Sequence, residues 1–242
     1  MSRPISGFGT LLFAIGIALC GWFIGDGIVS SRLADRYVTV KGVSERDVRA
    51  DIALWPLRFV VTDDDLGKAQ QQANASKSAI LDFLKRHGID DAKAELQGLE
   101  VNDVLANPYR SGPSTSRYIV TQTIMVRSEY PEVVQSASQS VNELVTAGVV
   151  LSSSGRPGSG PTFLFTGLTA LKPEMIAEAT ANARRAAEQF AQDSDSQLGT
   201  IRTANQGIFV ILPRDRAPGI TEGNQLNKTV RVVSTIQYYL DN

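Results

Sequence analysis

The apolar run near the N-terminus constrains this chain most. Residues 8–24 (FGTLLFAIGIALCGWFI) carry no charge, and Arg3 is the only charged side chain before them. As a helix, such a run rises about 25 Å, close to the roughly 30 Å hydrocarbon core of a bilayer. The pattern predicts one transmembrane helix over about 8–29, within an N-terminal segment 1–35. The anchor residues expected in it are Phe8, Leu11, Leu12, Phe13, Ile15, Ile17, Leu19, Trp22, Phe23 and Ile24.

The residues that follow favour an uncleaved anchor over a cleaved signal peptide. Residues 25–32 (GDGIVSSR) offer no A-x-A exit, although the small residues Ser30, Ser31 and Ala34 leave cleavage open. A lipoprotein signal at Cys20 is disfavoured because Leu19 is too large for that motif. A short tail, one apolar helix and a large polar domain predict that residues 36–242 are exported.

Composition restricts the function classes open to the exported part. The net charge is −1 and the 24 Lys and Arg residues are scattered, which argues against nucleic acid as a partner. The only cysteine, Cys20, lies in the apolar run, and the only histidine, His87, lies at the expected end of a helix. These counts exclude His/Cys metal sites and argue against Ser-His or Cys-His catalysis, and we assign no catalytic residue and no cofactor.

The first half alternates strands and helices. Strands are predicted at 37–42 and 51–61, where Pro56 indicates an edge position or a bulge. The acids at 63–65 cap a helix that ends at His87 with Gly88 after it. Strands 94–104 and 117–127 form a hairpin, and a helix follows from Pro131 to Gly148.

The second half repeats this order. It has a strand at 162–170, a helix at 173–193 with Pro173 in first position, and strands at 199–212 and 229–240. Two strand-helix-strand-strand halves, 36–151 and 161–242, predict an α+β domain of mainly antiparallel sheet with helices packed on it. Both hairpins carry loose tips, 105–116 and 213–227, whose candidate interaction residues are Tyr109, Arg110, Arg214 and Arg216.

Three stretches resemble the SIMPL-domain family, domain of unknown function 541, of bacterial envelope proteins. Residues 37–42 (YVTVKG) with 50–53 (ADIA) are similar to its opening strand and Pro-Asp-x-Ala turn, with Ala50 in place of the proline. Residues 177–191 with 198–201 (LGTI) resemble its alanine-rich helix and leucine-glycine exit, and 230–238 (VRVVSTIQY) its closing strand. The resemblance implies a periplasmic α+β domain, oligomeric rings in some members, links to oxidative or envelope stress, and no established enzymatic activity.

These observations predict a non-enzymatic scaffold or interaction protein, fixed to the bacterial inner membrane by one span with its domain in the periplasm. We expect homo-oligomers, built through strand edges such as 117–127 and 229–240, and an envelope protein as a further partner. A periplasmic binding module for a small or lipidic ligand is the alternative. A carboxylate enzyme is a third hypothesis, with Glu45, Asp47, Asp51, Glu95, Glu100 and Asp103 as the available acids.

Overall fold

The computed structural model describes residues 13–25, 36–90, 93–106, 116–152 and 160–241. The chain has a mixed α+β fold, as predicted, with two four-stranded sheets whose recorded strand pairings are antiparallel. It divides into two compact units. Unit 1 lies within Met1–Ser44, Pro173–Phe209 and Val232–Asn242, and unit 2 within Glu45–Lys172 and Val210–Arg231. The predicted halves 36–151 and 161–242 stay a prediction.

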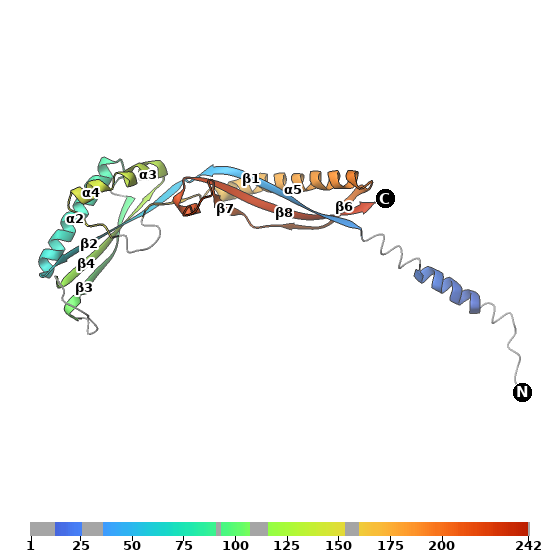
Figure 1. The fold of residues 1–242 in the computed structure, drawn as a ribbon, viewed down its shortest axis with the longest axis horizontal. Helices are drawn as coiled ribbons and strands as arrows, with labels where there is room; N and C mark the ends of the chain where they lie inside the picture. Colours follow the sequence, from blue (N-terminus) through green and yellow to red (C-terminus); the bar gives the residue numbers. More distant parts are fainter. Residues whose placement is uncertain (1–12, 26–35, 91–92, 107–115, 153–159, 242) are drawn as a thin grey trace, which may run out of the picture. The chain divides into compact units, whose positions relative to one another are not determined.

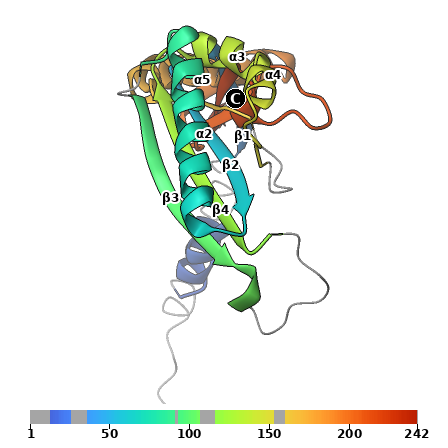
Figure 2. The same ribbon diagram turned by 90° about the vertical axis from the view of Figure 1, so that its left-hand side faces the viewer.

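Unit 2 is built on a sheet with the strand order β3-β4-β2-β5. Its strands are β2 (Ile52–Asp63), β3 (Ala94–Asp103), β4 (Tyr118–Ser128) and β5 (Thr162–Leu164). Every second residue of β2 and β4 is buried, and these residues face helix α2 (Leu66–Arg86), which runs along this face of the sheet (Figure 2). The core combines Trp55, Leu57 and Phe59 with Phe83 and Leu84.

Local signals set both ends of α2, as predicted. The Asp65 side chain accepts a hydrogen bond of 2.9 Å from the Lys68 N–H, which is the arrangement of an N-cap. His87 is the C-cap residue, and Gly88 follows with φ +79°, a conformation that favours glycine. The His87 Nε2 atom lies 3.3 Å from Glu143 Oε1.

The predicted helix from Pro131 to Gly148 is wrong as a single element. It consists of α3 (Pro131–Gln139) and the short α4 (Asn142–Thr146). Residues 135–142 (QSASQSVN) are rich in weak helix formers, and the Ser138 hydroxyl donates to the Gln135 carbonyl at 2.7 Å. Such local bonds compete with the helical ladder, so the helix ends early.

Pro56 occupies the kind of position predicted for it. β2 pairs with β4 throughout, but its other side pairs with β5 only at residues 52–54 and bonds again at Arg58 and Val60. Because backbone groups alternate sides along a strand, the missing N–H of Pro56 falls in the gap on that other side.

The second sheet has the order β1-β8-β6, and β7 also pairs with β8. These strands are β1 (Tyr37–Arg49), β6 (Gln197–Gln206), β7 (Val210–Pro213) and β8 (Asn227–Asp241). Helix α5 (Leu168–Asp193) lies along β1 and β8 (Figure 1) and buries Ala179, Ala183 and Ala187. A Cβ added to Gly42 would lie 1.8 Å from the Ala179 carbonyl oxygen, so β1 contacts the helix backbone itself.

Three predicted boundaries in the second half are wrong. The strand expected at 162–170 ends at Leu164, and α5 begins at Leu168, which places Pro173 inside the helix. The strand expected at 199–212 is interrupted between β6 and β7. There Gly207 approaches Val233 so closely that a Cβ would lie 2.7 Å from its carbonyl oxygen.

The pairing also corrects the expected sheet edges. The segments 117–127 and 229–240 correspond to β4 and β8, and both are interior strands with partners on each side. The long outer strands that follow helices α2 and α5 are instead β3 and β6.

The N-terminal anchor falls only partly within the described residues. Residues 13–25 are helical, and all their side chains are exposed, Trp22 to 76%. Phe8, Leu11 and Leu12 lie outside the described residues, as do residues 26–29 at the other end of the expected span. Among the helices that the structure describes, none has the length and apolar character needed to cross a membrane.

Candidate functional site

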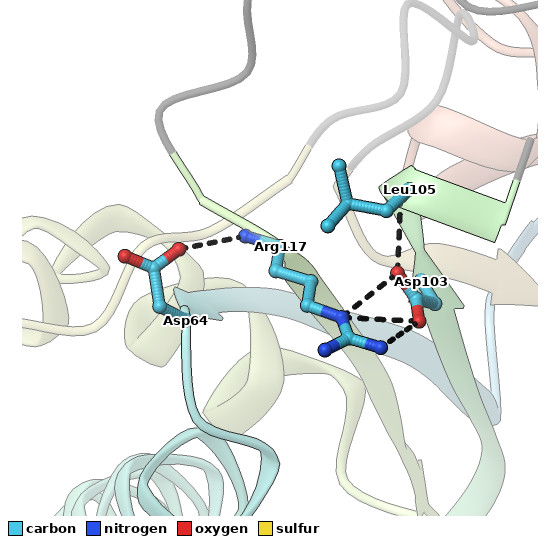
Figure 3. Close-up of polar contacts among 4 residues, drawn as sticks. All are labelled: Asp64, Asp103, Leu105 and Arg117. Carbon is cyan, nitrogen blue, oxygen red and sulfur yellow. Dashed lines mark hydrogen bonds and ion pairs between the residues drawn. The ribbon is translucent and has the colours of Figure 1, made fainter.

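The end of the β3–β4 hairpin is fastened by charged side chains (Figure 3). The Arg117 guanidinium donates from Nη2 to Asp103 Oδ2 at 2.9 Å and from Nε to both carboxylate oxygens at 3.2 and 3.3 Å. Asp103 Oδ1 also accepts from the Leu105 N–H at 3.0 Å, and Asp64 Oδ1 accepts from the Arg117 N–H at 3.0 Å. Loop 105–116 therefore starts and ends at an ion pair.

This geometry perturbs both charged groups. The hydrogen bond from Arg117 lowers the pKa of Asp103, and the same bond raises the pKa of Arg117. From the sequence, Asp103 is predicted only as one of six acids available to an enzyme. Opposite charges flanking a predicted hairpin loop are the signal that identifies the pair.

The two predicted interaction loops have different outcomes. Tyr109 and Arg110 lie outside the described residues. Arg214 and Arg216 are exposed, and the Arg214 guanidinium lies 3.3 Å from the Asp215 carboxylate.

The second loop is not loose, contrary to expectation. Its 3₁₀ helix Glu222–Asn224 begins with a capping box between Thr221 and Asn224. Asp215 and Gln225 exchange two hydrogen bonds across it, of 3.2 and 3.3 Å. Beneath the loop, the fully buried Lys228 ammonium binds the carboxylate and the backbone carbonyl of Glu222.

Asp51, in the turn between β1 and β2, binds the two residues that lead into α5. Its carboxylate accepts hydrogen bonds from the Thr166 N–H and hydroxyl at 2.9 Å and from the Gly167 N–H at 3.2 Å. A carboxylate at a helix N-terminus satisfies free N–H groups and suits the helix dipole. This contact, between residues 115 positions apart, gives the aspartate of the 50–53 motif a structural role.

The outer strand β3 presents uncovered apolar side chains. Leu96, Leu99 and Val101 pair with Ile124, Gln122 and Val120 of β4, so they belong to the row that faces α2. Their partners are buried, yet Leu96 and Leu99 are exposed to 48% and 53%. The apolar row on this face of the sheet therefore extends beyond the area that α2 covers.

The outer strand β6 has the same property. Ile201 pairs with the buried Tyr238 of β8 and is 52% exposed, and Ala204 pairs with the buried Ile236. Both strands are ten residues long and almost wholly exposed on their two faces. Long exposed edges of this kind are binding surfaces for further strands.

Most of the acids proposed for an enzyme have structural partners. Glu45 lies 3.3 Å from Arg231, Glu100 lies 3.6 Å from Arg58, and Asp47 accepts from the Thr229 hydroxyl at 2.7 Å. Asp51 and Asp103 have the roles described above. Glu95 lines a hollow together with Lys93 and Arg127, on the face of the sheet opposite α2. Within the described ranges, no group of three or more His, Cys, Asp or Glu residues is placed to hold a metal ion.

Comparison with known proteins gives one family. The family SIMPL, described as "Protein of unknown function (DUF541)", matches residues 38–233. No curated protein matches the chain. The matched residues run from the start of β1 into β8, and the residues that suggested the resemblance lie in elements of both sheets. The chain is a member of the SIMPL family.

Proposed function

We propose that this chain is a non-enzymatic scaffold or interaction protein that self-assembles, is anchored in the bacterial inner membrane and exposes its domain in the periplasm. The observation that carries the proposal is the pair of outer strands β3 and β6, whose apolar side chains have no cover among the described residues. Native proteins often protect such edges with charges or bulges, and both strands carry charged residues and register irregularities, but these leave Leu96, Leu99 and Ile201 uncovered. A neighbouring chain supplies the missing cover.

The anchor rests on the helix at 13–25. Its apolar side chains are exposed on all sides, Phe13 to 72%, and a helix that is apolar all round needs an apolar environment. A bilayer supplies that environment to the whole span of about 8–29, which also holds Ile15, Ile17, Leu19, Phe23 and Ile24.

The non-enzymatic part of the proposal is supported by the acids that form ion pairs or caps. A link to envelope or oxidative stress, and an envelope protein as a further partner, are parts of the same proposal; the family that the chain matches is itself described as of unknown function. The net charge of −1 supports a function without nucleic acid.

The mass of the full-length protein in mild detergent tests the proposal. Light scattering, with the detergent contribution subtracted, is expected to give a discrete oligomer of chains that retain their N-terminus. A monomer across a wide concentration range would contradict self-assembly.

A binding module for a small or lipidic ligand is the second candidate, favoured by a hollow in unit 2. Trp55, Leu57, Val141 and Leu151 line it together with Arg58, whose Nε atom is buried and has no hydrogen-bond partner in the described part of the chain. Apolar walls suit an aliphatic chain, and a fatty-acid carboxylate would share Arg58 with Glu100, whose carboxylate lies 3.6 Å from the guanidinium. Dodecanoate that raises the unfolding temperature of the wild type, and less so that of an Arg58→Gln variant, would support this candidate.

A further inference from the structure

We infer that the assembly forms by pairing β3 of one copy with β6 of the next, antiparallel, so that the two sheets join edge to edge. This inference rests on the self-assembly proposed above. It names the two surfaces that meet and the direction in which they meet.

The two strands match in length and in exposed side chains. Each has ten residues, and each leaves the backbone groups of its outer side without a strand partner among the described residues. A full overlap places Leu99 opposite Ile201 and Leu96 opposite Ala204. Both pairs then lie in the rows that continue from the buried cores. Pairing removes these apolar side chains from water and satisfies the backbone of both edges.

Charge favours this pair over the pairing of two identical edges. β3 carries Glu95 besides Glu100 and Asp103, which already pair with Arg58 and Arg117, and it has no basic residue, whereas β6 carries Arg202 and no acidic residue. Two copies of β3 would bring like charges together across the new joint, which is destabilising.

The other long edge, β1, is less suited to β3. Its apolar residues Val38 and Val40 are buried, so they need no further cover. Charge does not separate β1 from β6, because β1 carries Lys41, Arg46 and Arg49 besides Glu45 and Asp47; burial does.

The antiparallel direction of β3 and β6 follows from the side on which each sheet adds strands, when it is viewed from its helix. On β2, Arg58 and Val60 bond away from β4, so the alternate residues, Leu57 and Phe59, point their backbone groups toward β4 and their side chains toward α2. Arg36 and Ala50, which flank β1, bond to Leu240 of β8 and to Leu226 just before it, so the even-numbered residues of β1 point their backbone groups toward β8. Val38 and Val40 therefore do so while their side chains are buried on the α5 side.

When each sheet is viewed from its helix, with β2 or β1 running upward, the neighbouring strand therefore lies on the same side, and β3 and β6 are the outer strands on that side. If their helix-covered faces are continuous across the joint, one sheet is turned by half a revolution in its own plane, which makes β3 and β6 antiparallel. Because the two edges differ, the contact is heterologous, so the copy that contributes β3 keeps a free β6 and the copy that contributes β6 keeps a free β3 for further neighbours.

Disulfide trapping tests the contact directly. The only cysteine is first removed (Cys20→Ser), and single cysteines are placed at Gln97 of β3 and at Thr203 of β6, which face each other on the side away from the helices in the full overlap. Full-length Gln97→Cys and Thr203→Cys proteins are mixed in mild detergent and oxidised. The matched control replaces Thr203→Cys by Thr39→Cys on β1, which is also an exposed residue of an edge strand.

The expected result is a covalent dimer in the 97/203 mixture, at least tenfold above the 97/39 mixture and above either 97 or 203 alone. A dominant 97/39 or 97/97 dimer would overturn the inference and leave self-assembly standing. An oligomer by light scattering with no trapped β3 contact would do the same. A monomer by light scattering would overturn both proposals.

As an independent readout, Ile201→Lys is expected to lower the oligomer mass, and Thr39→Lys is expected to leave it unchanged.

Discussion

Asp51 is a single side chain that sets where a long helix begins. Its carboxylate accepts from three donors of Thr166 and Gly167, just before α5. We predict that Asp51→Ala lowers stability by about 1–2 kcal/mol, the usual effect of losing a helix cap. In a chain of this size that corresponds to roughly 2–8 °C in the unfolding temperature, measured by circular dichroism in mild detergent.

The matched control for Asp51 is Asp82→Ala on the exposed side of α2. Surface changes of this kind stay within about 0.5 kcal/mol, so its unfolding temperature should remain near that of the wild type. Equal shifts for the two variants would show that the Thr166 and Gly167 contacts add nothing.

Asp103 makes the hairpin end sensitive to acid. Its pKa is lowered below the ordinary value of 3.8 by the hydrogen bond from Arg117. A lowered pKa in the folded state stabilises that state above the unfolded pKa of about 3.9, and the contribution is lost as the pH falls through the folded value. We predict that hydrogen exchange at the Leu105 N–H, corrected for its intrinsic rate, shows protection that declines only below about pH 4.

Asp103→Asn separates this effect from general acid unfolding. The variant retains an acceptor but cannot titrate, so the decline at Leu105 should disappear, while exchange at Val126 in the buried part of β4 stays as in the wild type. An unchanged decline in the variant would assign the pH dependence to another group.

The residues predicted correctly from sequence act on near neighbours. Asp65 caps α2 through the N–H of a residue three positions on, and Gly88 follows the end of the same helix. Both roles can therefore be predicted from the spacing of nearby residues. The partners of Asp51 lie 115 positions away, and no spacing rule reaches that far. Arg117 and Asp103 are intermediate, because a predicted hairpin already brings its two ends together.

At the scale of elements, Gly42 sets how closely α5 packs on β1. A Cβ there would lie 1.8 Å from the Ala179 carbonyl and 2.4 Å from the Ala183 nitrogen, and backbone atoms cannot move aside as a flexible side chain would. We predict that Gly42→Ala lowers stability by about 3 kcal/mol or more, at or above the upper end of overpacking costs.

Gly160→Ala is the comparison for this change. A Cβ added at Gly160 meets no atom within 4 Å, so the unfolding temperature should be nearly unchanged. If Gly42→Ala also unfolds at the wild-type temperature, helix and strand are not in the tight contact described.

Element boundaries failed where tertiary contacts outweigh local preference. Pro173 is a good first residue of a helix, yet Asp51 fixes the start five residues earlier, at Leu168. The Gly207 interruption depends on its approach to Val233 of β8, which only pairing reveals. The alternating pattern did identify β4 and β8, but alternation says which face is buried and not which strands are neighbours.

The whole molecule combines strands in an order that element sequence alone does not predict. β5 precedes α5 in the chain, yet it pairs with β2, whereas β1 completes the sheet that α5 covers. The first strand of each predicted half, β1 or β5, thus lies in the sheet formed by the other half. The α+β class and its antiparallel pairing followed from periodicity, but this exchange depends on long-range packing, and the edges β3 and β6 appear only once it is known.

At the scale of the whole molecule, the proposed anchor and the proposed assembly surfaces consist of different residues, so the two proposals can be tested separately. Ile17 and Leu19 are exposed in the helix at 13–25, and an arginine within a span costs roughly 2.5–3.5 kcal/mol at its centre. We predict that Ile17→Arg with Leu19→Arg removes the full-length protein from bacterial membranes washed with carbonate and leaves its oligomer mass unchanged.

Arginine at Ile208, which is 82% exposed in the domain, is the matched control and should leave the protein in the membrane fraction. Retention of the double variant in the membrane would contradict the anchor. Loss of the oligomer together with membrane binding would mean that the anchors, rather than the strand edges, hold the copies together.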